Sequence, residues 1–135
     1  MRSASHAGGV VFRRRNGVTE FLLVRSKDRT CRVLPKGHIE HGEDAPAAAS
    51  REVCEETGYL LDAGPPLGVF TYETRMGAVT TAYFLMEAAL DLQPGELEER
   101  FRDPRWFTID EVDEADLPLP DGMRELLERA LRAIA

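Results

Sequence analysis

The sequence predicts an α/β fold, an α/β/α sandwich in which a mixed β-sheet lies between helices. Three observations support this fold class. Short runs rich in β-branched and aromatic residues alternate with turn residues along most of the chain. A helix of small and acidic residues interrupts these runs, and an amphipathic helix follows the last of them. The sequence shows no internal repeat or low-complexity tract, so we expect one layered domain with helices on both faces of the sheet.

The first predicted strands are residues 7–13 and 19–25, separated by the turn-like residues 15–17 (Arg-Asn-Gly). They form a hairpin or two neighbouring antiparallel strands. Gly8 and Gly9 stand at the start of the first strand, where the lack of side chains lets another part of the chain come close. A bulge or crowding in the core would account for these two glycines equally well.

The remaining predicted strands are residues 32–34, 59–61, 67–75, 78–88 and 105–109. The third and fourth of these are joined at Met76-Gly77, most simply as a second hairpin. An acidic loop is predicted before the last strand.

Two helices are predicted near the C-terminus. Thr108 and Glu111 have the spacing of a capping box, in which each side chain binds the backbone N–H of the other residue, and they start a short helix. Asp121 is predicted to cap the final helix. The apolar residues of that helix follow helical spacing and are expected to dock on the sheet: Met123, Leu126, Leu127, Ala130, Leu131 and Ile134.

The length of 135 residues predicts a single domain over residues 1–135. Seventeen basic and 24 acidic residues give a net charge of −7, so the overall field is not suited to holding nucleic acid. The charge is uneven, because residues 13–36 hold eight basic side chains and residues 87–121 hold twelve acidic ones. A basic stretch before an acidic helix is consistent with a small polyanionic ligand. For the three arginines at 13–15 we expect only a solvated hairpin tip.

Cys31 and Cys54 lie far apart and lack the spacing of metal ligands, which predicts reduced thiols in a reducing compartment. The N-terminus has no apolar signal core, and no apolar run is long enough to span a bilayer. We therefore expect a cytoplasmic location without a membrane partner.

Residues 37–59 carry the strongest functional signal. Asp44 is a predicted N-cap, Pro46 falls in the first turn of a helix, and Gly58 suits its C-terminal end. At about 100° per residue, three glutamates share one face of this helix with only Ala45, Ala48 and Ala49: Glu52, Glu55 and Glu56. The opposite face carries small residues expected to pack on the sheet: Pro46, Ala47, Ser50, Val53, Cys54 and Thr57.

Like charges at this spacing repel one another, so the acidic face indicates a site for a hard cation such as Mg²⁺, which prefers oxygen ligands. The alternative is a solvated acidic surface. The glycine-bearing loop that precedes the helix counts against it, because an ordinary surface helix does not need such a loop.

The same stretch resembles the Nudix box, whose pattern is Gly, five residues, Glu, seven residues and then Arg-Glu-aliphatic-x-Glu-Glu-x-Gly-aliphatic. The matching residues are Gly37, Glu43, Arg51, Glu52, Val53, Glu55, Glu56 and Gly58. Tyr59 departs from the pattern, since an aliphatic residue is usual there. The element order extends the resemblance to the Nudix hydrolase (MutT-like) family over nearly the whole chain, and it implies the α/β/α Nudix fold.

The resemblance implies hydrolysis of a pyrophosphate linkage in a nucleoside diphosphate joined to a further group X, with Mg²⁺ or Mn²⁺ as cofactor. It implies Glu52 and Glu56 as the first metal ligands, with Glu55 and the carbonyl of Gly37 as further ligands. Arg51 would orient the acidic residues through an ion pair with Glu43. These three glutamates and Arg51 are the expected catalytic set.

Two candidates remain for the general base, Glu52 itself and an acid from a distant loop. The loop candidates are Glu96, Glu98, Glu99 and Asp103, with Glu99 slightly preferred. For any single one of them, a solvated loop residue is the competing interpretation.

For the substrate, the run Leu-Pro-Lys-Gly-His resembles the dinucleoside polyphosphate hydrolase branch and the related diphosphoinositol polyphosphate branch. Lys36 would then point at a phosphate, and His38 would contact the ligand. Tyr83 is the predicted aromatic residue of the cleft, because Phe84 has the opposite parity and is expected in the core.

The preferred substrate is a diadenosine polyphosphate. Oxidised nucleoside triphosphates, ADP-ribose and capped or triphosphorylated RNA ends are the alternatives, and an RNA 5′ end is the only nucleic acid expected as a partner. A non-catalytic nucleotide-sensing module is the alternative from a different class, but such modules typically lose the acidic residues that are intact here. A monomer or a homodimer is expected.

Overall fold

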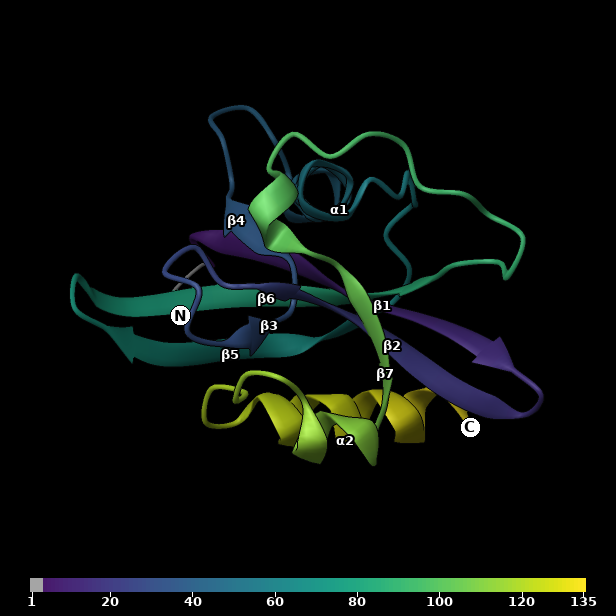
Figure 1. Cartoon of the computed structure of the whole chain (residues 1–135). Helices are drawn as coiled ribbons and strands as arrows, with labels where there is room; N and C mark the ends of the chain where they lie inside the picture. Colours follow the sequence, from purple (N-terminus) through teal and green to yellow (C-terminus); the bar gives the residue numbers. More distant parts are fainter. Residues whose placement is uncertain (1–3) are drawn as a thin grey trace.

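The computed structural model describes residues 4–135, except for the side chain of Thr74. A mixed seven-stranded sheet lies between two helices (Figure 1). Five strands follow one another in the order β3-β2-β1-β6-β5: Arg32–Val33 (β3), Val18–Arg25 (β2), His6–Arg15 (β1), Gly77–Glu87 (β6) and Pro66–Thr74 (β5). Helix α1 (Ala45–Thr57) lies over one face of the sheet and helix α2 (Met123–Ile134) over the other. The predicted α/β/α sandwich is confirmed.

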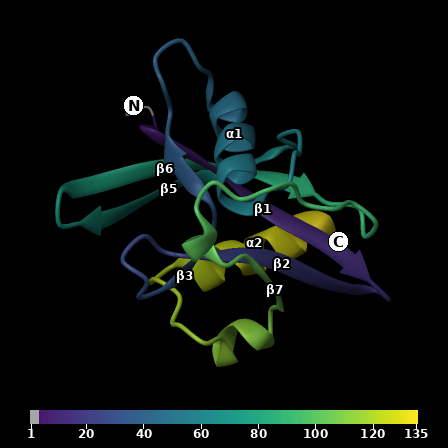
Figure 2. The same ribbon diagram turned by 45° about the horizontal axis from the view of Figure 1, so that its top comes forward.

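Two shorter strands complete the sheet. Strand β4 (Lys36–His38) pairs antiparallel with the start of β1, and β7 (Arg105–Thr108) pairs antiparallel with β2. The β1–β6 pairing is parallel, whereas β5–β6 and β1–β2 are antiparallel hairpins. Figure 2 shows β4 lying alongside α1, which sets the loop before the helix against the sheet.

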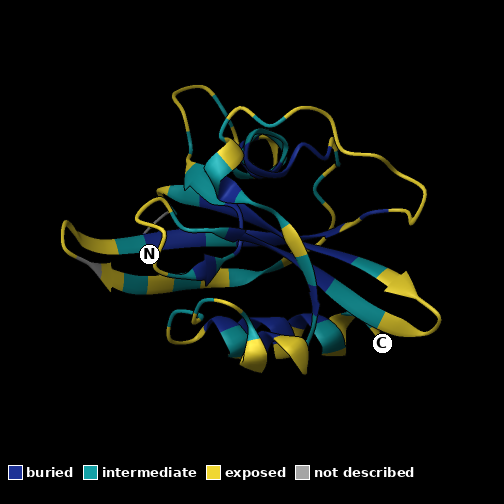
Figure 3. Ribbon diagram, viewed as in Figure 1, coloured by how far each residue is buried: buried dark blue, intermediate teal, exposed yellow. Residues whose placement is uncertain are grey.

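The sheet separates two apolar cores, and the central strands are buried on both faces (Figure 3). Val10, Phe12 and Leu23 face α2 and pack with Leu127. Val11 and Phe84 face α1 and pack with Val53. Alternating side chains of each strand therefore fill the space under both helices.

The first hairpin turns where the sequence predicts. Asn16 and Gly17 both have positive φ, at 52° and 79°, as the tight turn of a two-residue hairpin requires. Gly9 lies where α1 presses on the sheet, because a Cβ there would stand 2.6 Å from Val53 Cγ2. Close packing of the core, rather than a bulge, therefore accounts for this glycine.

Helix α1 begins and ends as predicted. The side chain of Asp44 accepts a hydrogen bond of 2.8 Å from the backbone N–H of Ala47. Gly58 ends the helix with φ of 81°, and its N–H donates to the carbonyl of Cys54. The predicted packing face is wrong in part, because Ala48 and Ala49 are fully buried whereas Pro46 and Ala47 are exposed.

Four other local predictions have mixed outcomes. Thr108 and Glu111 form the reciprocal capping box ahead of a short 3-10 helix, η2 (Glu111–Glu114). Residues 59–61 are not a strand, because after Gly58 the chain bonds locally and to the loop at Gly95 instead of to a neighbouring strand.

Asp121 is not the cap of α2; Gly122 takes that position with φ of 85°. A second short 3-10 helix, η1 (Arg100–Arg102), lies in the predicted acidic loop.

No helix among the described residues is long and apolar enough to cross a membrane.

Candidate active site

The acidic face of α1 meets the glycine loop at Gly37, in strand β4. A Cβ added to Gly37 would stand 2.1 Å from Glu52 Cδ and 2.2 Å from Glu52 Oε1. Only a residue without a side chain therefore lets the Glu52 carboxylate lie against the backbone of β4. The close approach of loop and helix expected from the sequence is present.

Arg51 binds the carboxylates around it. Its Nε and Nη2 donate to the two oxygens of Glu43 at 2.8 and 2.9 Å, and Nη1 donates to Glu52 Oε1 at 2.9 Å. Nη2 also donates to the carbonyl of His38 at 2.9 Å, which ties α1 to β4. The bidentate contact lowers the pKa of Glu43 from 4.5 to about 2. The predicted Arg51–Glu43 ion pair is thus present.

Glu56 is the most deeply buried carboxylate of the helix, with 4% of its surface exposed. Burial raises the pKa of Glu56 to about 8; the charge of Arg102 opposes this rise, and the neighbouring Glu52 carboxylate adds to it. Two carboxylates that share a partly dry space favour a cation between them, because a cation removes both their repulsion and the cost of burying charge.

Glu52 and Glu56 are suited to an open site for Mg²⁺, in which water and substrate supply part of the coordination, rather than to a site made entirely of protein side chains. No group of three or more His, Cys, Asp or Glu side chains with metal-binding spacing occurs among the described residues. Glu55 accepts hydrogen bonds of 3.3 Å from Arg51 Nη1, and burial followed by the charge of Glu52 raises its pKa. Mg²⁺ usually binds through one or two carboxylates and takes its other ligands from water and substrate phosphates. The carboxylate pair therefore suffices for Mg²⁺.

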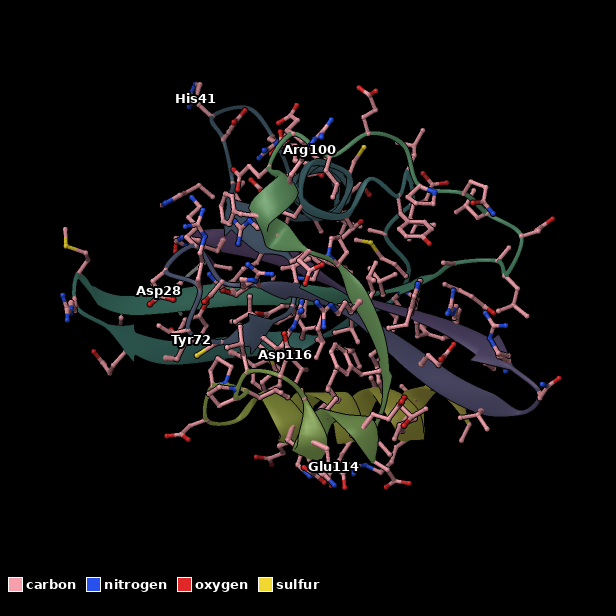
Figure 4. All side chains as sticks on the ribbon, viewed as in Figure 1. Asp28, His41, Tyr72, Arg100, Glu114 and Asp116 are labelled. Atoms are coloured by element: carbon pink, nitrogen blue, oxygen red, sulfur yellow. The ribbon has the colours of Figure 1, made fainter. Side chains whose placement is uncertain are left out.

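A cleft of about 560 Å³ opens beside Glu56. The residues that line it include the polar or charged Lys36, Arg102 and Glu56 and the apolar Phe70 and Leu126. Asp28, from the loop after β2, and Tyr72, from β5, both line the cleft and are labelled in Figure 4. His41, by contrast, stands at the tip of the exposed loop between β4 and α1 (Figure 4).

The predicted aromatic residue of the cleft, Tyr83, is too deeply buried to offer its ring face for stacking against a base. It lines the cleft but is only 2% exposed, with its ring packed edge-on against Phe70 at 6.1 Å between centroids. Its hydroxyl, like that of Tyr72, has no hydrogen-bond partner among the described residues. Tyr83 is thus a buried wall residue whose hydroxyl is enclosed by the protein, and Phe84 lies in the core as expected.

Lys36 and His38 both line the cleft. Lys36 Nζ lies 5.4 Å from the ring centroid of Tyr72, so a cation and an aromatic ring stand together at this position. The ring of His38 packs against that of His6 at 4.1 Å between centroids, with the two ring planes tilted by 41°. His6 gave no signal in the sequence, and burial, followed by the charges of His38 and Lys36, lowers its pKa to about 4.

The loop acids differ in their surroundings. Glu99 Oε2 accepts a hydrogen bond of 2.9 Å from Arg102 Nε, and Arg102 Nη2 stands 3.6 Å from Glu56 Oε1. Asp103 is held by three arginines, and Glu96 and Glu98 are exposed. Glu99 is therefore the loop acid that is joined to Glu56 through Arg102, and Arg102, like His6, gave no signal in the sequence.

An acidic helix held against a glycine-bearing strand, beside a cleft in a sheet between two helices, defines a class of α/β proteins that present carboxylates at the edge of a cleft. The NUDIX domain model matches residues 3–130, so the chain belongs to that family.

Known proteins similar to this chain include two relatives identified by sequence. It is 32% identical over 100 residues to the 8-oxo-(d)GTP phosphatase of Mycolicibacterium smegmatis, which covers 73% of this chain and 30% of that protein. It is 32% identical over 124 residues to Nudix hydrolase 12, mitochondrial, of Arabidopsis thaliana, covering 85% of this chain and 60% of that protein. The chain spans between 16% and 60% of the length of these two relatives and two further curated ones.

Among solved structures, the Ap4A hydrolase of C. elegans is similar over almost the whole fold. The two superpose with a TM-score of 0.79 at 25% identity, covering 99% of this chain and 100% of that one.

Proposed function

We propose that this chain is a metal-dependent pyrophosphohydrolase, which cleaves a phosphoric anhydride bond in a nucleoside diphosphate linked to a further group. The observation that carries the proposal is the Glu52–Glu56 carboxylate pair, in which Glu52 lies against Gly37 and Glu56 lines the cleft. Membership of the NUDIX domain family supports it. Such a site supplies positioning and charge stabilisation, which are the main requirements of phosphoryl transfer.

Each site residue has a role in this proposal. Glu52 and Glu56 would hold Mg²⁺, or Mn²⁺ in its place, with Glu55 and the carbonyl of Gly37 as further ligands; the ion would neutralise charge on the phosphate oxygens during attack by water. Arg51 keeps the carboxylates in place through Glu43 and the carbonyl of His38. The proton of the attacking water passes to Glu52 or to the loop acid Glu99.

The preferred substrate is a diadenosine polyphosphate. Lys36 would bind a phosphate, and its neighbour Tyr72 offers a partly exposed ring beside it. His38 would contact the same end of the ligand, and Tyr83 would form part of the cleft wall behind it. The similarity over the whole fold to a protein named Ap4A hydrolase supports this substrate class.

A second candidate substrate is an oxidised nucleoside triphosphate. The M. smegmatis relative is named 8-oxo-(d)GTP phosphatase, and it is 32% identical to this chain over 100 residues. A nucleotide-sensing module without turnover is disfavoured by the intact glutamates of α1. We also propose a reducing, cytoplasmic location, because Cys31 and Cys54 are both free thiols.

Product analysis by chromatography tests the proposal. The purified protein is incubated with Mg²⁺ and diadenosine tetraphosphate, diadenosine hexaphosphate, 8-oxo-dGTP, ADP-ribose or a triphosphorylated RNA, beside a Glu56→Gln variant. The matched control is Glu114→Gln, which removes the same charge from an exposed acid of η2 that does not line the cleft. We expect the diadenosine compounds to be cut fastest and Glu56→Gln to be inactive.

The other outcomes distinguish an error in the proposed substrate from an error in the proposed hydrolysis. Fastest turnover of 8-oxo-dGTP, with Glu56→Gln still inactive, would keep the chemistry and replace the substrate. Nucleotide binding without any product, in Mg²⁺ and in Mn²⁺, would favour the sensing module.

A further inference from the structure

A buried arginine joins the acidic face of α1 to the loop that follows β6. Arg102 is only 5% exposed although it lines the cleft. Its Nε donates to Glu99 Oε2 at 2.9 Å, and its Nη2 lies 3.6 Å from Glu56 Oε1. Nη1 donates to the carbonyl of Arg25 at 3.1 Å, which fixes the plane of the guanidinium. One side chain therefore contacts a carboxylate of the helix and a carboxylate of the loop through different nitrogens.

The loop that carries Arg102 is fixed on both sides of it. The N–H of Gly95 donates to the carbonyl of Gly58, just past the end of α1, at 2.7 Å. On the other side Asp103 has φ of 43°, and the fully buried Arg32 donates to its carbonyl at 2.6 Å and to its carboxylate at 2.9 Å. Arg102 thus reaches Glu56 from a backbone with little freedom to move.

We propose that Arg102 is a positioning residue, which holds the carboxylate of Glu99 next to Glu56 so that Glu99 takes the proton of the attacking water. This inference rests on the proposed function. In the step, the water oxygen forms the new bond to phosphorus and its proton passes to Glu99. The bridging P–O bond breaks, and its electron pair leaves with the departing phosphate. Arg102 itself gains and loses nothing.

An arginine is suited to this role for a geometric reason. The guanidinium presents several N–H donors in one rigid plane, so it can bind two carboxylates at fixed positions, whereas lysine offers a single point charge on a flexible stem. The Glu99 side chain is 42% exposed, and the contact with Arg102 holds its carboxylate against the same guanidinium that lies beside Glu56. Loss of this contact would leave Glu99 free to turn into solvent.

Steady-state kinetics with diadenosine tetraphosphate and Mg²⁺ test the inference on Arg102→Gln, Arg102→Lys, Glu99→Gln and the double variant Arg102→Gln/Glu99→Gln. We expect the first and third to lower kcat about 100-fold, the size of a lost general base, with KM within about threefold of the wild type. Because both changes remove one function, the double variant should be no more than about threefold slower than the slower single variant. Arg102→Lys should lose at least about tenfold, since one ammonium cannot bind both carboxylates.

Arg100→Gln is the matched control, because Arg100 is an exposed arginine in the same 3-10 turn (Figure 4). It should keep wild-type kcat. Thermal melts check that each variant is folded. If Arg102→Gln does not fold, the kcat of Arg102→Lys serves as the test of the inference. A kcat within threefold of wild type for the folded Arg102 variants would overturn the inference, as would losses that multiply in the double variant. If the wild type itself cuts no substrate, the proposed function fails, and this inference fails with it.

Discussion

At the scale of single residues, Gly37 gives the most direct prediction. A Gly37→Ala change places a methyl group 2.1 Å from Glu52 Cδ, so the carboxylate must leave its place against β4. We expect Mn²⁺ affinity and kcat/KM to fall about 10- to 100-fold, as when the surroundings of a metal ligand are disturbed. Mn²⁺ binding followed by electron paramagnetic resonance measures the first of these.

Gly95→Ala is the control for that change. Its added Cβ would meet only the carbonyl of Gly58, at an ordinary contact distance of 3.5 Å. Equal Mn²⁺ affinity in both variants would show that the place of Glu52 against Gly37 does not matter for binding.

We expect burial of His6 to lower the free energy of unfolding of the protein in mild acid. Its pKa is lowered from 6.5 to about 4 in the folded protein, first by burial and then by the charges of His38 and Lys36. Between these two values the unfolded chain binds more protons than the folded one, so the free energy of unfolding falls as the pH drops from about 6.5 to about 4. Thermal melts at pH 7 and pH 5 should show a smaller drop for His6→Gln than for the wild type. A drop of the same size in both would contradict the assignment to His6.

The residues of the site were predictable to different degrees. Glu52, Glu56 and Arg51 are close in sequence, and the geometry of one helix places them together, so their spacing alone reveals them. Arg102 and His6 reach the same cleft from segments far away in the sequence, and nothing local marks either of them. For Tyr83, strand parity gave the correct face of the sheet, but the depth of burial depends on Phe70 from the neighbouring strand.

At the scale of secondary-structure elements, the well-predicted features are those with local causes. The caps of α1 depend on Asp44 and Gly58, and the first hairpin on Asn16 and Gly17. Strand β4 was not predicted, because its three residues become a strand only by pairing with β1. The cap of α2 was misplaced for a related reason: the turn at Gly122 serves the helix without a side-chain hydrogen bond.

Arg32 in β3 predicts the largest loss of stability. Its side chain is fully buried, donates to Asp116 at 2.9 and 3.1 Å, and contacts both the carbonyl and the carboxylate of Asp103. Removal of one partner from a buried ion pair costs about 3–5 kcal/mol. Both aspartates are partly exposed and can take up water, so for Arg32→Met we expect the lower end, about 3 kcal/mol, measured by urea unfolding.

Arg105→Met is the matched change in the neighbouring strand β7. Arg105 pairs with the same two aspartates, but its side chain is 52% exposed. Exposed ion pairs contribute about 0–1 kcal/mol, so this variant should stay close to the wild type. Similar losses from the two variants would mean that burial of Arg32 does not determine the energy of the network.

At the scale of the whole molecule, the fold brings two halves of the chain to one cleft. Helix α1 and strand β4 supply the carboxylates and the glycine, while the hairpin of β5 and β6 and the start of α2 supply the apolar wall. The loop before β7 adds Arg102 to the lining of the cleft. Because this packing buries Glu56 of α1, the free energy of unfolding depends on whether the Glu56 carboxyl group is charged.

This coupling predicts how metal-free protein responds to pH. The pKa of Glu56 is raised from 4.5 to about 8 by burial and by Glu52, so the folded state holds a proton that the unfolded chain releases between these values. The contribution of Glu56 to stability is complete below pH 4.5 and is lost as the pH rises to about 8. A bound cation removes the same penalty, and a ligand that binds only the folded state stabilises it by about 2.7 kcal/mol at a concentration of 100 times its Kd.

Magnesium should therefore stabilise the protein more at pH 8 than at pH 6, because at pH 6 a proton competes for Glu56. The measurement is the difference in Tm between samples in EDTA and in excess Mg²⁺, at both pH values, for the wild type and for Glu56→Gln. Glutamine cannot ionise, so the variant should show a small Mg²⁺ effect that is the same at both pH values. A wild-type Mg²⁺ effect of equal size at pH 6 and pH 8 would mean that Glu56 is not the group at which proton and metal compete. The cation would then have to be held mainly by Glu52, with Glu56 neutral on the wall of the cleft.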